Sequence, residues 1–185
     1  GMEFAAGIPG SVGGALVMNA GAYGSEIKNI LKSARVMTNE GEVLELSVDE
    51  LELGYRTSCI PGRGYTVLEA SFQLEPGDGA AIEARMKELA ARRREKQPLE
   101  YPSAGSTFKR PQGYFAGKLI EDAGLRGYGM GGARVSEKHC GFVINGGNAT
   151  ASDVMALCGH IRKTVLEQSG VELEMEVKRW GNFDL

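Results

Sequence analysis

Glycine is frequent in this chain, and its positions are clustered. The 185 residues include 27 glycines, most of which gather at 7–24, 54–64, 124–132 and 141–147. They do not repeat with a fixed period, which excludes a collagen-like or low-complexity fold. Glycine permits positive φ and a close approach of the backbone to a ligand. The clusters therefore predict many tight turns, and their grouping favours turns that face a ligand.

The clearest regular segment before the middle of the chain is a helix predicted over residues 79–96. Asp78 can cap its N-terminus. Its apolar residues share one helical face, at Ile82, Met86, Leu89 and Ala90. Pro98 ends the pattern, so the sequence predicts a domain boundary here, followed by a loop over 97–111.

Residues 26–75 predict a β-rich segment ahead of this helix. Short apolar runs at 34–37 and 42–46 flank a turn that contains Gly41, which is typical of a β-hairpin. Residues 66–74 predict a further strand.

Helices dominate after residue 113. One is predicted over 114–123, and a second begins in a capping box at 150–153 and ends at Gly170. Residues 141–145 predict a buried strand, and the alternation over 171–177 predicts a half-buried one. Strands that precede helices, with one strand returning at the end, indicate an α+β fold. The last strand is expected to rejoin the first sheet.

Composition excludes several classes of protein. The net charge of −3 gives no electrostatic case for nucleic acid, and no apolar run approaches a membrane span. No signal peptide is expected at the start of the chain. The three cysteines, Cys59, Cys140 and Cys158, form no CxxC pair or Cys/His cluster. We therefore expect reduced thiols in a cytoplasmic protein, with no metal site.

The glycines at 7–14 leave backbone N–H groups open to an anion such as a pyrophosphate. A purely structural turn explains the same residues. The segment is neither a GxGxxG fingerprint nor a Walker motif, because the flanking strand–helix unit and the Gly-Lys-Ser/Thr ending are absent.

Two further residues are candidates for binding or chemistry. Arg56 follows Tyr55 and could hold a carboxylate bidentately, although an ordinary surface ion pair is the alternative. Ser106 could cap a turn, or act as an acid if Lys109 or Arg110 assisted it.

Glu176 stands beside Glu172 and Glu174 on the polar face of the last predicted strand, and periodicity alone does not distinguish it. Of the two histidines, His160 is expected to be structural. His139 fits either packing or ligand contact.

Six segments together resemble one enzyme family. They occur in the order 7–14 (GIPGSVGG), 18–23 (MNAGAY), 55–56 (YR), 103–109 (SAGSTFK), 135–139 (VSEKH) and 173–177 (LEMEV). This order resembles the flavin-dependent UDP-N-acetylenolpyruvoylglucosamine reductases of peptidoglycan synthesis. The family's activity is reduction of UDP-N-acetylglucosamine-enolpyruvate to UDP-N-acetylmuramate, with NADPH as reductant and noncovalent FAD as carrier.

The resemblance implies roles for named residues. Ser106 matches the proton donor, Arg56 the arginine beside the substrate carboxylate, and Glu176 the glutamate that polarises that carboxylate. The implied FAD contacts are Gly7, Ile8, Pro9, Gly10, Ser11, Gly13 and Gly14. The implied substrate contacts are Tyr55, Lys96, Lys109 and Lys178.

The resemblance also implies a domain organisation. Residues 1–96, rejoined by 170–185, match the second half of a two-part FAD-binding domain with a mixed or antiparallel sheet and helices. Residues 97–169 match a small α+β substrate-binding domain. The first FAD-binding subdomain of the family has no counterpart here, and we expect it as a covalent or separate partner.

The chain resembles the shorter subgroup of the family, which lacks an extra tyrosine-bearing loop. Met175 replaces a proline that is usual in the family, and Lys178 replaces an arginine that many members carry. The implied function is therefore a cytoplasmic reductase of cell-wall synthesis, and hence of cell shape and division, acting on a small UDP-sugar. The alternatives are a UDP-sugar-binding module with little flavin binding or turnover, and a domain that binds neither ligand.

Overall fold

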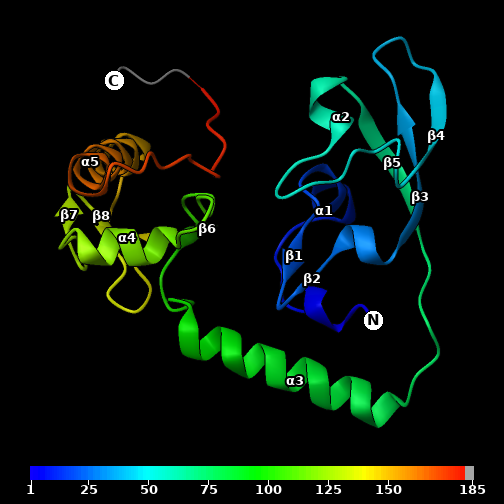
Figure 1. Ribbon diagram of the computed structural model, residues 1–185, viewed down its shortest axis with the longest axis horizontal. Coiled ribbons are helices and arrows are strands. Elements are labelled where there is room, and N and C mark those ends of the chain that lie inside the picture. Colours follow the sequence, from blue (N-terminus) through cyan, green and yellow to red (C-terminus); the bar gives the residue numbers. More distant parts are fainter. Residues whose placement is uncertain (182–185) are drawn as a thin grey trace. The chain divides into compact units, whose positions relative to one another are not determined.

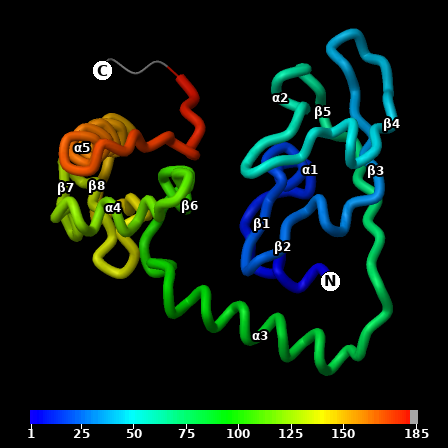
Figure 2. The backbone as a smooth tube through the Cα atoms, viewed as in Figure 1, coloured from blue at the N-terminus to red at the C-terminus, as the bar shows by residue number. Residues whose placement is uncertain are grey.

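The computed structural model describes residues 1–181 and divides the chain into two compact units (Figure 1). Unit 1 comprises Gly1–Arg92 and unit 2 comprises Arg93–Leu185. Each unit contains helices and antiparallel sheet, which confirms the predicted α+β class. Figure 2 follows the backbone through both units.

Unit 1 is built on a three-stranded antiparallel sheet with the order β4-β3-β5. Its strands are β3 (Leu31–Met37), β4 (Val43–Ser47) and β5 (Thr66–Phe72). The predicted hairpin is confirmed: Gly41 has φ 86°, and the N–H of Thr38 donates to the Glu42 carbonyl at 2.9 Å. Ala34 and Val36 of β3 are buried while Arg35 and Met37 are exposed, so one face of this part of the sheet covers the core of unit 1.

Short elements complete unit 1. They are η1 (Glu3–Ala5), α1 (Val12–Val17), β1 (Gly21–Ala22), β2 (Ser25–Glu26), η2 (Ile27–Asn29) and α2 (Cys59–Gly62). Helix α1 packs against β5, where a Cβ at Gly13 would lie 3.6 Å from the Cβ of Val67. The most deeply buried apolar side chains of this core include Leu16, Val36, Leu51 and Ile60.

Helix α3 (Gly79–Lys96) has the predicted bounds. The carboxylate of Asp78 accepts hydrogen bonds from the N–H groups of Ala80 and Ala81, as expected of a cap. Of the expected apolar face only Leu89 is buried, and Met86 is 41% exposed. Ion pairs along the helix, such as Lys87–Glu83, are exposed and contribute little each.

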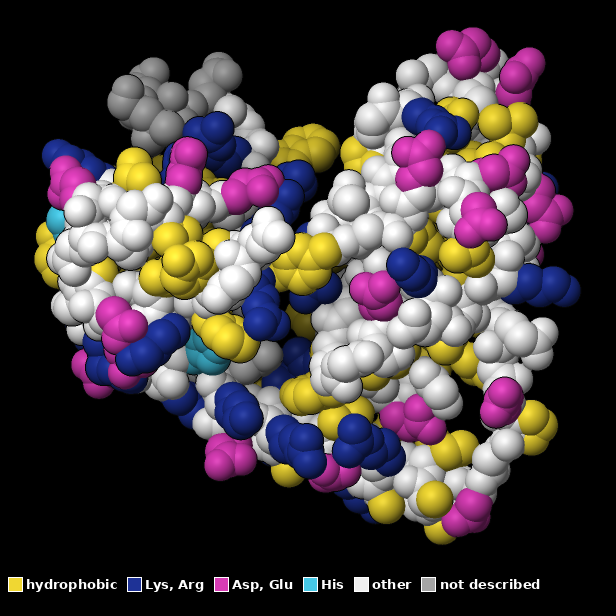
Figure 3. All heavy atoms as spheres, viewed as in Figure 1, with side chains coloured by type: hydrophobic (Ala, Val, Ile, Leu, Met, Phe, Trp, Pro, Cys, Tyr) yellow, Lys and Arg dark blue, Asp and Glu magenta, His cyan; other side chains and the backbone are white. Residues whose placement is uncertain are grey.

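Lys and Arg side chains gather along α3 on the face shown in Figure 3. The boundary between the units falls inside this helix, after Arg92, rather than after Lys96 as the proline pattern suggested. Tyr23 of unit 1 donates to the Leu89 carbonyl of this helix, whereas Lys138 of unit 2 donates to the Arg94 carbonyl.

Unit 2 contains a four-stranded antiparallel sheet with the order β6-β9-β8-β7. The strands are β6 (Ser103–Ser106), β7 (Gly129–Met130), β8 (Ala133–Val135) and β9 (Phe142–Asn145). Its helices are α4 (Ala116–Asp122) and α5 (Ala151–Ser169). No helix within residues 1–181 is long and apolar enough to cross a bilayer.

Helix α5 begins and ends where the sequence predicts. Thr150 and Asp153 form the reciprocal capping box, and Gly170 ends the helix in the left-handed region at φ 70°. Its apolar stripe lies in the core of unit 2.

The segment after α5 differs from the expected strand. Within 171–177 only Met175 forms a β-bridge, and its partner is Phe108 of unit 2. The alternating pattern is explained by packing, because Leu173 is buried in the core of unit 2. The described part of this segment therefore pairs with unit 2, whereas we expected it to rejoin the first sheet.

Candidate active site

The glycine-rich loop at 7–14 leads directly into α1. Ser11 is the N-cap of this helix, and its Oγ accepts a hydrogen bond from the N–H of Gly14 at 3.1 Å. Gly7 and Gly10 have φ of 78° and 136°, which other residues rarely adopt. A Cβ at Gly10 would meet no atom of the described chain within 4 Å. The loop is largely exposed, so its backbone fits close approach by a phosphate-bearing cofactor.

Arg56 occupies a tight turn in unit 1. The N–H of Gly54 donates to the Thr57 carbonyl at 3.1 Å, and the N–H of Thr57 donates to the Gly54 carbonyl at 3.4 Å. Tyr55 and Arg56 therefore form the corner of the turn. Arg56 has φ 55°, in the left-handed region. Its Nη2 donates to the carbonyl of Gly21 at 3.1 Å, and its guanidinium lies 5.4 Å from the Tyr55 ring centroid. The cation is thus held by contacts within unit 1.

Asn19 is a positioning residue that sequence reasoning missed. Its side chain is only 1% exposed, and its Nδ2 donates to the carbonyl of Gly54 at 3.1 Å. Its Oδ1 accepts from the N–H of Lys28 at 3.0 Å. Asn19 therefore connects the Arg56 turn to the start of the unit 1 sheet region. The only signal was an asparagine inside a glycine cluster.

Ser106 ends β6 and lies opposite Phe142 of β9. Gly105, with φ 86°, precedes it, and the register shifts between Ser103 and Ser106. Ser106 is exposed at this irregular strand end. A hydroxyl in such a position is accessible to a substrate.

Thr107 joins Ser106 to the segment that carries Glu176. Its carbonyl accepts from the N–H of Glu176 at 2.9 Å, and its N–H donates to the carbonyl of Gly141 at 2.9 Å. Its hydroxyl, in a side chain that is 3% exposed, accepts from the buried N–H of Val143 at 2.9 Å. These bonds place the backbone of Glu176 beside that of Thr107, the residue that follows Ser106.

The predicted lysines have different surroundings. Lys109 forms an ion pair with Glu174, and its N–H donates to the Glu174 carbonyl at 2.8 Å. Lys96 is exposed at the last residue of α3. Tyr55 is exposed in unit 1.

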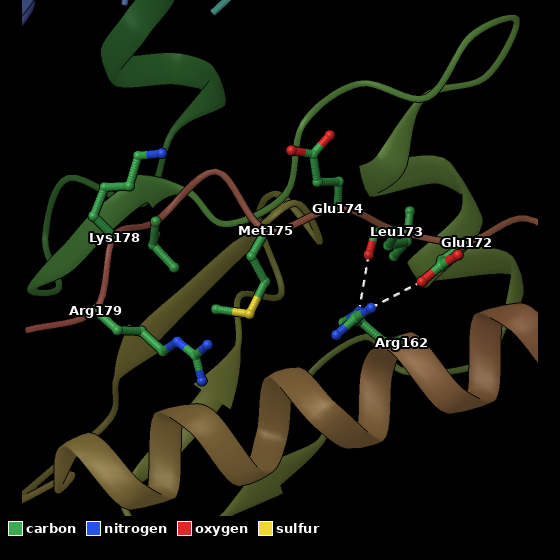
Figure 4. A pocket seen from close by; sticks show the side chains of 8 residues that line it. Arg162, Glu172, Leu173, Glu174, Met175, Lys178 and Arg179 are labelled. Atoms are coloured by element: carbon green, nitrogen blue, oxygen red, sulfur yellow. Dashed lines mark hydrogen bonds and ion pairs between the residues drawn. The ribbon is translucent and has the colours of Figure 1, made fainter. Parts of the chain in front are cut away.

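Lys178 lines a hollow between α5 and the C-terminal segment (Figure 4). On one side, Arg162 pairs with Glu172 at 3.0 Å and donates from Nε to the Leu173 carbonyl at 2.9 Å. Met175 lies between this pair and Arg179. The flexible side chain of Met175 thus forms part of the wall.

His139 is partly buried beside β9. Its Nδ1 accepts from the N–H of Gly141 at 3.0 Å, and its ring meets Phe142 edge-on at 5.0 Å. Burial lowers the pKa of His139 below its ordinary value of 6.5. These contacts give His139 a packing role next to the residue opposite Ser106.

The three cysteines are buried thiols. Burial raises the pKa of Cys158 to about 11 and also raises the pKa values of Cys59 and Cys140. Within residues 1–181 no group of three or more His, Cys, Asp or Glu side chains could hold a metal ion.

Two of the three predicted catalytic residues, Ser106 and Glu176, lie within unit 2, where Glu176 bonds to Thr107, the residue after Ser106. Arg56 belongs to unit 1.

Comparison with known proteins gives two family matches along the chain. Residues 97–180 match the C-terminal domain of UDP-N-acetylenolpyruvoylglucosamine reductase, and residues 1–47 match an FAD-binding domain. The chain is 63% identical to the UDP-N-acetylenolpyruvoylglucosamine reductase of Agathobacter rectalis, over 99% of this chain and 58% of that protein. The chain belongs to the UDP-N-acetylenolpyruvoylglucosamine reductase family.

Two further members of this reductase family are similar to the chain over nearly its whole length. The protein of Geobacillus thermodenitrificans is 60% identical over 98% of this chain and 60% of its own length. The crystal structure of UDP-N-acetylenolpyruvylglucosamine reductase from Thermus caldophilus superposes with a TM-score of 0.85 at 35% identity, and covers 98% of this chain and 64% of that one. The chain thus spans only part of its relatives' length, about 58% in the case of the Agathobacter rectalis protein.

The two matched ranges contain different predicted site residues. The FAD-binding match contains the glycine loop at 7–14, and the C-terminal match contains Ser106 and Glu176. Arg56 lies between the two matched ranges.

Proposed function

We propose that this chain forms part of a cytoplasmic flavoenzyme that reduces UDP-N-acetylglucosamine-enolpyruvate to UDP-N-acetylmuramate with NADPH through FAD. The product is a peptidoglycan precursor. The observation that carries the proposal is the hydrogen bond from the N–H of Glu176 to the Thr107 carbonyl, because it places the backbone of Glu176 beside the residue that follows Ser106. The identity of the substrate is inferred from the names of the relatives.

The proposed reaction adds a hydride to one carbon of the enolpyruvyl double bond and a proton to the other. FAD held at the glycine loop over 7–14 would supply the hydride after its reduction by NADPH. Ser106 then donates the proton from its exposed position at the end of β6. Charge develops in the substrate carboxylate during hydride addition, so groups that face it contribute most in the transition state.

Arg56 and Glu176 are proposed to act on this carboxylate. A guanidinium held by the Gly21 carbonyl offers fixed donors to the carboxylate oxygens. Glu176 can donate to the carboxylate only when protonated. The glycine loop at 7–14 is proposed to hold the FAD pyrophosphate, since Gly7 and Gly10 keep side chains away from the exposed backbone.

Substrate contacts are proposed for Tyr55, Lys96, Lys109 and Lys178. The part of the family's length that this chain does not span is proposed as a covalent or separate partner that completes the FAD site.

One alternative is a UDP-sugar-binding module with little flavin binding or turnover. It is favoured by the observation that unit 2 has its own core and alone contains Ser106, Lys109 and Glu176. Two measurements distinguish this module from the reductase. Absorbance reports whether the chain binds flavin, and calorimetric titration of the UDP-sugar into the chain and its Arg56→Ala variant reports sugar-nucleotide binding. A colourless chain that binds the sugar nucleotide supports the module.

The reductase proposal is tested by Ser106→Ala in a protein completed with the part of the Agathobacter rectalis relative that this chain does not span. Loss of a general acid slows its step by roughly 100-fold or more. In stopped-flow absorbance, flavin reduction by NADPH should stay unchanged while flavin reoxidation by the enolpyruvyl substrate slows. Equal losses in both half-reactions would show that Ser106 is not the proton donor.

A further inference from the structure

Ser58 lies two residues after Arg56 and makes two hydrogen bonds through one hydroxyl group. Its Oγ donates to the carbonyl of Val17 at 2.7 Å, across 41 positions of sequence. The same Oγ accepts from the N–H of Ile60 at 3.3 Å, and Ser58 is the N-cap of α2. The hydroxyl therefore acts as donor and acceptor at once, and it fixes the backbone where the Arg56 turn ends.

The acceptor of the Ser58 hydroxyl belongs to the helix that follows the glycine loop. Val17 is the last residue of α1, and a carbonyl at the C-terminus of a helix has no partner within that helix. Ser58 donates to this carbonyl from a distant part of the chain. The opposite end of α1 begins at its N-cap Ser11, within the loop proposed to hold the FAD pyrophosphate. One short helix thus connects the proposed cofactor loop to the end of the Arg56 turn.

Two further hydrogen bonds hold the other parts of this turn. Asn19 donates to the carbonyl of Gly54, at the residue where the turn begins. Arg56 itself donates from Nη2 to the Gly21 carbonyl. Together with the Ser58 bond, these contacts fasten the turn before, at and after Arg56 to the segment 17–21.

This fastening matters because Arg56 has a strained backbone. Its φ of 55° lies in the left-handed region, and such a conformation persists only where surrounding contacts impose it. The bond from Ser58 to Val17 is the contact that restrains the C-terminal side of the turn. All of these residues belong to unit 1, so the restraint is complete within one compact unit.

We infer that Ser58 is a positioning residue for Arg56, and that its bond to Val17 holds the guanidinium where it meets the substrate carboxylate. The inference rests on the proposed function, which gives Arg56 that carboxylate as its ligand. Without the hydroxyl, the turn is free to relax and the guanidinium loses its fixed place. Binding then has to restore the order of Arg56, which lowers affinity for a ligand that carries the carboxylate.

The test measures ligand binding to the chain of residues 1–185 by calorimetry. The two ligands are UDP-N-acetylglucosamine-enolpyruvate and UDP-N-acetylglucosamine, which lacks the enolpyruvyl carboxylate. Ser58→Ala removes the hydroxyl, and Ser58→Gly also removes it but keeps a residue that is well tolerated at a helix N-cap. Ser58→Thr keeps the hydroxyl. Each loss variant is also combined with Arg56→Ala.

Ile60→Val is the matched control for a general loss of stability in unit 1. Ile60 lies in the core of this unit, two residues after Ser58, and the substitution removes one methyl group. The Ser58 hydroxyl and the Ile60 N–H that it accepts from both remain in this control.

Ser58→Ala and Ser58→Gly should raise the Kd for the enolpyruvyl ligand about threefold to tenfold, as expected for the loss of one hydrogen bond. The Kd for UDP-N-acetylglucosamine should change less than about twofold, because this ligand has no carboxylate for Arg56. Ser58→Thr and Ile60→Val should bind both ligands like the unchanged chain. In the Arg56→Ala background, loss of the Ser58 hydroxyl should have no further effect, because the guanidinium that it positions is gone.

Several results overturn the inference while the proposed function stands. They are an unchanged Kd for the enolpyruvyl ligand in both loss variants, equal weakening of the two ligands, or an undiminished effect in the Arg56→Ala background. The last two results would show that Ser58 merely stabilises unit 1. If Arg56→Ala itself weakens both ligands equally, or if the unchanged chain binds neither ligand, the proposed role of Arg56 in this chain fails and the inference falls with it.

Discussion

Replacing Thr107 with valine tests whether its buried hydroxyl holds the ladder beside Ser106. Valine has nearly the same shape as threonine, so the substitution removes the acceptor of the Val143 N–H and leaves little cavity. An unsatisfied buried N–H destabilises by about 1–3 kcal/mol. Amide exchange at Val143 should therefore accelerate by roughly 5- to 150-fold, at 1.4 kcal/mol for each tenfold.

Thr107→Ser is the matched control, because it keeps the hydroxyl and loses only a methyl group, at about 1 kcal/mol. Hydrogen exchange followed by NMR measures both variants, and amides of β3 in unit 1 serve as an internal reference. If Val143 exchanges no faster in Thr107→Val than in Thr107→Ser, the hydroxyl does not stabilise this part of the ladder.

Two further predictions concern residues next to the proposed catalytic groups. His139 has a lowered folded pKa, so its stabilisation is present above the unfolded pKa of about 6.5 and is lost as pH falls through the folded pKa; urea unfolding at pH 7.5 and 5 should show a smaller loss on acidification in His139→Gln than in the unchanged chain. Asn19→Ala should destabilise unit 1 by at least ~2 kcal/mol, since two buried hydrogen bonds disappear; denaturation monitored by unit 1 amides checks this, and an unchanged midpoint would contradict the positioning role.

Elements with strong local signals could be predicted from the sequence. The hairpin around Gly41, helix α3 and the capping box at Thr150 all depend on residues a few positions apart. Their hydrogen-bond partners lie within the same window of sequence, so tertiary contacts were not needed to find them.

Elements that depend on distant partners could not be predicted. Strand β6 falls in the expected loop over 97–111, and its partner β9 lies far along the chain. The reverse error occurred at 171–177, where alternation reflects burial of Leu173 and only one bridge forms. A period of two shows which side chains are buried, and says nothing about whether a neighbouring strand is available.

The site shows the same division. Glu176 looked like any glutamate on a solvated strand, and the family resemblance alone selected it. Its N–H bonds to the carbonyl of Thr107, the residue after Ser106, and no side-chain pattern reports such a backbone contact. Asn19 was equally hidden, because its two partners are backbone groups at Gly54 and Lys28.

The positive φ of Arg56 sets thermal stability against the proposed binding role of its side chain. An L-residue in the left-handed region is strained by roughly 1–2 kcal/mol, and glycine relieves that strain. Laboratory selection of this chain for heat resistance alone should enrich glycine at position 56 wherever relief of that strain exceeds the loss of the hydrogen bond to the Gly21 carbonyl. Such heat-resistant variants would lack the guanidinium. A screen that measures stability and not turnover would therefore select against the residue proposed to bind the substrate carboxylate.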